Sequence, residues 1–101
     1  MTTSNEILEE WQRIKDEIPE NQRSRSLQVR SVTDYIISKN KEGIVQYRLY
    51  DEVRNFFRVV GSHETTATGS EMDVTDAFNY LLDTKKITYK QEGDFTIFCP
   101  V

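Results

Sequence analysis

The apolar residues of the C-terminal third change their spacing from helical to strand-like. Between positions 73 and 83 they recur three and four residues apart, at Val74, Ala77, Phe78, Leu81 and Leu82, which is typical of an amphipathic helix. Beyond Lys85 and Lys86 the period becomes two, at Ile87, Tyr89, Phe95, Ile97 and Cys99. The pattern predicts a helix with Asp73 as its N-cap, followed by a β-hairpin.

The alternation also predicts a register for this hairpin. Residues opposite each other share a face of the ribbon, so the apolar positions of both strands face the core together only if the loop has an odd number of residues. A three-residue loop over positions 91–93 meets this condition and places Gly93 where a left-handed residue is needed. The predicted pairs are Tyr89 with Phe95 and Ile87 with Ile97. Phe98 is then expected to face outward.

The N-terminus has the pattern of a separate amphipathic helix. Thr3 and Glu6 have the spacing of a capping box, and Pro19 ends the helix. A narrow apolar stripe runs between them, at Ile7, Trp11, Ile14 and Ile18. Two interpretations of the stripe are open. It docks on the core of its own domain, or it pairs with its twin in a homodimer, which makes residues 1–23 a possible dimerisation element.

Two further helices and a short strand are predicted in the middle of the chain. Ser24 or Ser26 can cap a helix that runs to about Asn40, with Leu27, Val29, Val32, Ile36 and Ile37 inward. After Gly43, a short extended segment of Ile44, Val45 and Tyr47 is expected to form a third strand beside the hairpin. A third helix follows, with Leu49, Val53, Phe56, Phe57 and Val60 inward. The segment 61–73 lacks periodicity until the last helix and is predicted to be a flexible loop.

This order of elements resembles the winged helix-turn-helix superfamily. The resemblance covers about residues 26–100 and rests on Gly43, Ile44 and Val45 after the first helix of the domain, Val53 and Phe57 in the second, and the apolar series from Val74 to Ile97. It implies an α+β winged helix-turn-helix domain over residues 24–101, with an extra N-terminal amphipathic helix and a C-terminal β-hairpin wing. Lys85 and Lys86 stand where many members have a glycine.

The resemblance implies a DNA-binding function. In this superfamily the helix before the wing usually enters the major groove, while the wing and the preceding helix contact phosphates. Carried over to this chain, the candidate DNA-binding residues are Arg48, Arg54, Arg58, Thr75, Asn79, Lys85, Lys86 and Lys90. We therefore expect double-stranded DNA as the partner of a small transcriptional or replication regulator that acts as a homodimer.

An alternative function is a protein-interaction module. Asp76 and Asp83 lie on the helix that would face the bases, and Glu92 and Asp94 lie at the tip of the wing. These carboxylates would repel phosphate, so the acidic helix and wing favour another protein as the partner. A replication, transcription or phage- or virus-encoded inhibitory assembly is the expected setting.

Composition narrows the remaining function classes. The chain has 101 residues and a net charge of −4, but residues 24–60 carry seven basic and four acidic side chains, which leaves a local basic patch possible. Cys99 and His63 are the only residues of their types, so the sequence predicts no disulfide, no metal site, no cofactor and no enzymatic activity. No membrane span or secretory signal is evident, and the protein is expected in the cytoplasm.

Overall fold

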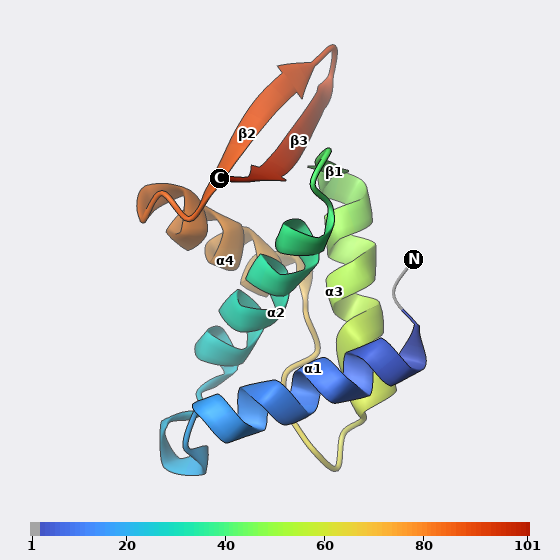
Figure 1. Ribbon diagram of the computed structural model, residues 1–101, viewed down its shortest axis with the longest axis vertical. Helices are drawn as coiled ribbons and strands as arrows, with labels where there is room; N and C mark the ends of the chain where they lie inside the picture. The colour runs from blue at the N-terminus through green and yellow to red at the C-terminus, as the bar shows by residue number, and fades with distance from the viewer. Residues whose placement is uncertain (1–2) are drawn as a thin grey trace.

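The chain folds as an α+β structure in which a helical body carries a small antiparallel sheet at one end (Figure 1). The computed structural model describes residues 3–101. Its elements are α1 (Ser4–Glu17), the short 3-10 helix η1 (Glu20–Gln22), α2 (Arg25–Lys39), β1 (Ile44–Val45), α3 (Gln46–Val60), α4 (Glu71–Asp83), β2 (Ile87–Glu92) and β3 (Phe95–Pro100). The strand order is β1-β3-β2. This arrangement is consistent with a winged helix, and the third strand is where the sequence predicts it.

The N-terminal helix belongs to the same hydrophobic core as the rest of the chain. The Thr3 hydroxyl caps α1 by accepting a hydrogen bond from the Glu6 amide at 3.2 Å, as predicted. Ile7, Trp11 and Ile14 are buried, and α1 runs across the C-terminal half of α3 (Figure 1). The prediction that the stripe from Ile7 to Ile18 forms a dimerisation surface is therefore corrected. Ile7, Trp11 and Ile14 fill the core of their own domain, and Ile18 is half-buried against it.

The next two helices follow the predicted pattern with two differences. Ser24 caps α2, and the predicted inward positions of α2 and α3 are buried. Leu27 is the exception, because it lies in the first turn of α2 and remains 38% exposed. Tyr47 lies in the first turn of α3 and not in the extended segment, since the strand β1 ends at Val45. Tyr47 therefore projects from a helix, at the end of α3 that meets the sheet.

The last helix begins earlier than the apolar pattern predicts. Its N-cap is Ser70, whose hydroxyl accepts a hydrogen bond from the Asp73 amide at 3.3 Å. Asp73 is the third helical residue and its carboxylate lies 3.4 Å from Nε of Arg25. Apolar spacing does not reveal this start, because the first turn holds Glu71, the exposed Met72 and Asp73, and the buried series begins only at Val74.

The segment between α3 and α4 is packed, which corrects the expectation of a flexible loop over 61–73. Thr65 and Ala67 are buried; the Thr65 hydroxyl donates to the side-chain oxygen of Gln28 and accepts from the Ala67 amide at 3.0 Å. Gly69, at φ +68, lies so close to α3 that an added Cβ would be 3.0 Å from a methyl group of Val53. Small residues here permit close approach to the core, although they give no periodic signal.

The hairpin has a different register from the predicted one. Tyr89 pairs with Phe98, and Glu92 pairs with Phe95 across a two-residue turn that begins at Gly93, with φ +61. A glycine in the first position of a two-residue turn suits the twist of a hairpin. The even loop turns Phe98 inward, where its ring centroid lies 4.5 Å from that of Phe78. Phe95 faces outward, so the predicted pairs and the outward position of Phe98 are both wrong.

The end of α4 has Lys85 in a conformation that normally favours glycine. Lys85 has φ +61 and is the one non-glycine residue with positive φ in the described part of the chain. The amide of Lys86 donates to the carbonyl of Leu81 at 2.9 Å, and the amide of Lys85 donates to the carbonyl of Leu82 at 3.0 Å. These two bonds define a Schellman motif, in which the residue after the C-cap is left-handed.

Candidate interaction surface

The exposed face of α4 carries acidic charge. Helix α4 contains no Lys or Arg, whereas Glu71, Asp76 and Asp83 are exposed on it. Of the two α4 residues among the candidate DNA-binding residues, Asn79 is exposed, but Thr75 is half-buried and its hydroxyl lies 2.7 Å from the hydroxyl of Tyr50. A helix with this charge is a poor partner for the phosphates that flank the major groove.

The six predicted cations do not form a single patch. Arg48, Arg54 and Arg58 lie on α3, whereas Lys85 and Lys86 follow α4, and Figure 1 places α3 and the C-terminal end of α4 on opposite sides of α2. Two of the six also have carboxylate partners nearby. Arg48 lies 3.5 Å from Glu52, and Lys90 lies 3.4 Å from Glu92.

The outward side of α3 forms one continuous stripe. Tyr47, Asp51, Arg54 and Arg58 follow one another at intervals of four, three and four residues, which places them along one line of a helix, and all four are exposed. Within residues 3–101, Arg54 and Arg58 have no ion-pair partner, in contrast to Arg48. The stripe therefore combines an aromatic end near the wing with a cationic end near the loop.

The aromatic end of the stripe is extended by the wing. The rings of Tyr47 and Phe95 lie 6.2 Å apart between centroids and are inclined by 55°, yet the two residues are 59% and 55% exposed. Shallow clefts of about 260 and 220 Å³ flank the pair, and Val45 and Ile97 line the second of them. We call Tyr47, Asp51, Arg54, Arg58 and Phe95 the α3–wing face.

Sequence reasoning missed this aromatic pair for two reasons. It placed Tyr47 in a strand, and it turned Phe95 toward the core. A signal was present in β3, where Phe95 and Phe98 are three residues apart and must lie on opposite faces of a strand. One of the two rings therefore has to face away from the core.

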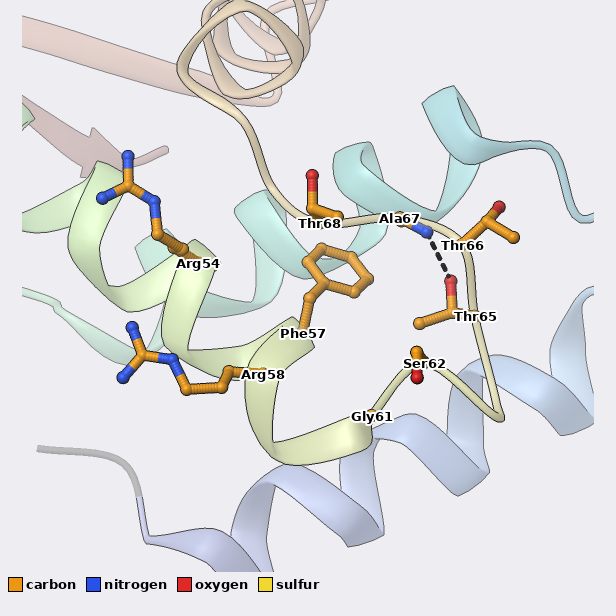
Figure 2. A pocket seen from close by; sticks show the side chains of 9 residues that line it. All are labelled: Arg54, Phe57, Arg58, Gly61, Ser62, Thr65, Thr66, Ala67 and Thr68. Atoms are coloured by element: carbon orange, nitrogen blue, oxygen red, sulfur yellow. Dashed lines mark hydrogen bonds between the residues drawn. The ribbon is translucent and has the colours of Figure 1, made fainter.

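The cationic end of the stripe borders a groove of about 610 Å³ between α3 and the loop. Figure 2 shows Phe57 between the two arginines on one side and the loop residues Ser62, Thr65 and Thr68 on the other. Both guanidinium groups point to the same side of α3, away from the loop (Figure 2). The groove thus has an aromatic floor, a wall of hydroxyl groups and two charged side chains at its edge.

The loop wall is held by a carboxylate outside the groove. Glu64 accepts a hydrogen bond from the indole of Trp11 and lies 3.4 Å from Nζ of Lys15, and these two contacts lower the pKa of Glu64. The same loop therefore contacts α1 through Glu64, α2 through Thr65 and α3 through Gly69. Contacts to three helices fix the position of the groove wall.

We also searched the described residues for a metal site and for a membrane-spanning helix. In the described part of the chain, no three His, Cys, Asp or Glu side chains are grouped so that they could hold a metal ion. Among residues 3–101, no helix combines the length and the apolar character needed to cross a membrane. Comparisons with protein-family models, with curated proteins and with solved structures gave no match.

Proposed function

We propose that this chain is a winged-helix protein-interaction module that meets its partner through the α3–wing face. The observation that carries the proposal is the Tyr47 and Phe95 pair, two large aromatic side chains in mutual contact that are both more than half exposed. Exposed aromatic clusters are unusual on isolated domains and are enriched among the residues that dominate protein interfaces. Their rings give contact area while losing little conformational entropy.

The charge of α4 supports the same proposal. Binding of a DNA duplex depends on cations that replace the counterions of the phosphates. In the arrangement implied by the superfamily, the helix closest to the duplex is α4, which has several exposed carboxylates and no basic residue. A protein partner has no such requirement.

Duplex DNA binding is the second candidate. It is favoured by Arg54 and Arg58, which are exposed and have no ion-pair partner in the described residues. In the superfamily this helix contacts phosphates, so two arginines one turn apart are suitably placed for a backbone contact. A homodimer would join two such patches, and the avidity of two sites would compensate for the weakness of each.

Site-specific photocrosslinking tests the first candidate. A benzophenone amino acid is placed at position 47 or 95 in cells that naturally contain the protein, and crosslinked proteins are identified by mass spectrometry. Position 89 is the matched control, because Tyr89 is also an aromatic wing residue, 58% exposed, but pairs with Phe98 on the opposite face of the ribbon. We expect the same crosslinked protein from positions 47 and 95 and not from position 89.

Fluorescence anisotropy with a labelled duplex separates the two candidates. We expect no saturable binding even at about 50 mM salt. Saturable binding that is weakened by Arg54→Gln with Arg58→Gln, with the slope of log affinity against log salt reduced by roughly 0.9 per lost contact, would favour DNA. The absence of a common adduct from positions 47 and 95 would count against the protein-interaction proposal.

A further inference from the structure

The groove beside the α3–wing face has a wall that the core holds in place. Gly69 at its end touches α3: an added Cβ would be 3.1 Å from the Val53 carbonyl oxygen and 3.2 Å from the Phe57 ring. The Thr65 hydroxyl bonds to Gln28 on α2 and to the Ala67 amide, shown as the dashed line in Figure 2. A volume of about 610 Å³ is within the range of roughly 300–1,000 Å³ that is common for ligand sites.

The groove is positively charged in a protein of net negative charge. Its lining includes Arg54 and Arg58 and no carboxylate, whereas the whole chain has a net charge of −4. Ser62, Thr66 and Thr68 add exposed hydroxyl groups on the opposite wall. Phe57 and Ala67 lie at the floor but are each only 3% exposed, so the aliphatic parts of the two arginines add to the apolar surface that a ligand can contact. Anionic groups beside an apolar side chain would match this lining.

We propose that the groove binds an acidic peptide segment of the partner protein, with an apolar side chain in the groove and carboxylates paired with Arg54 and Arg58 at its edge. This inference rests on the proposed function, since it names the chemistry of a protein partner. Guanidinium groups form strong paired hydrogen bonds with carboxylates. Ser62 and Thr68 line the same groove, and their hydroxyl groups can bond to the backbone of the segment.

The lining favours a peptide over a nucleic acid strand. A strand needs cations that follow its backbone and aromatic faces for its bases. Here the cations are limited to two positions of α3, and the next exposed residue along the stripe is Asp51. A peptide with one apolar side chain between two carboxylates requires only two cations and an apolar lining, and the groove has both.

The test is a titration of the full chain, labelled with ¹⁵N, with the capped peptide Asp-Glu-Leu-Phe-Glu-Asp. We expect saturable amide shifts concentrated in residues 54–68. Arg54→Gln with Arg58→Gln should weaken binding about tenfold or more, because two charge-assisted bonds are lost. Arg48→Gln is the matched control: it removes the same charge from the same helix at a residue paired with Glu52, and should change affinity less than about twofold.

Two ligand controls complete the test. Replacing Leu-Phe in the peptide by Ser-Ser should weaken binding about tenfold, because burial of an apolar side chain is lost. A single-stranded thymidine hexanucleotide should bind more weakly than the acidic peptide. The proposal is overturned if the peptide gives no saturable shifts, if the shifts lie elsewhere, if the double variant binds equally well, or if the oligonucleotide binds as tightly. If a protein is crosslinked from position 47 and any of these results is also obtained, the proposed function stands and only the proposal of a peptide site in the groove is rejected.

Discussion

The indole Nε1 of Trp11 donates a hydrogen bond to the carboxylate of Glu64 at 3.4 Å, which joins the first helix to the loop between α3 and α4. Trp11 is otherwise buried against the core. One side chain therefore supports both the docking of α1 and the position of the loop that walls the groove. The stability of α1 and the shape of the groove are expected to change together.

Trp11→Ala is expected to destabilise the fold by about 3–5 kcal/mol, because it leaves a large cavity in the core. The measurement is urea denaturation followed by circular dichroism. Trp11→Phe is the control, since it retains much of the apolar contact and loses the hydrogen bond, and should cost considerably less. Sedimentation velocity on the folded proteins should show no change in association state. A dimer that dissociates on substitution, without loss of protomer stability, would restore the dimerisation interpretation of the stripe.

The contribution of Glu64 to stability should depend on pH. Its folded-state pKa lies below the ordinary value of 4.5, through the Trp11 hydrogen bond and the Lys15 charge. The ionised group therefore stabilises the fold above pH 4.5, and this contribution is lost as the pH falls through the folded-state pKa. Urea midpoints of the protein and of Glu64→Gln should differ at neutral pH and converge in acid. Glu9→Gln controls for the loss of one exposed charge. If the urea midpoints of the two variants depend on pH in the same way, the contacts of Glu64 with Trp11 and Lys15 do not stabilise the fold.

Lys85→Gly is expected to stabilise the protein by about 0.5–1 kcal/mol. A left-handed conformation costs a residue with a side chain roughly 1–2 kcal/mol, and part of the gain is offset by the greater flexibility of glycine in the unfolded chain. The control is Lys86→Gly, because Lys86 does not have positive φ and glycine there brings only the entropic loss. Thermal denaturation of both variants checks the prediction. Equal effects at the two positions would show that the left-handed conformation carries little strain.

Gly69→Ala tests whether the loop is packed. Gly93→Ala is the matched control, since Gly69 and Gly93 have φ of +68 and +61, but an added Cβ meets α3 only at Gly69 and has nothing within 4 Å at Gly93. Gly93→Ala should cost about 1–2 kcal/mol through backbone strain, and Gly69→Ala should cost more, through the added clash. Chemical denaturation gives the two values. Equal costs, together with rapid amide exchange across 61–70, would support a flexible loop.

The helices and their inward faces are largely predictable from local patterns. The Thr3 cap of α1, the Ser24 cap of α2 and the five buried positions of α3 all follow from spacing and capping chemistry. The start of α4 does not follow from apolar spacing, because the first turn after Ser70 buries no side chain fully and the buried series begins only at Val74. The candidate surface is only partly predictable: the sequence indicates Arg54 and Arg58 as binding residues, but it places Tyr47 in a strand and turns Phe95 toward the core.

The sequence by itself determined the order of the elements and the faces that the helices bury, because helical periodicity and caps act within a few residues of the chain. Only the tertiary structure decided the hairpin register, since β3 has apolar side chains on both faces and the contact of Phe98 with Phe78 selects which face is buried. The same applies to α1 and the loop. An apolar stripe does not specify its partner, and small polar residues give no periodic signal, so the contacts of Trp11, Thr65 and Gly69 depend on segments far away in the chain.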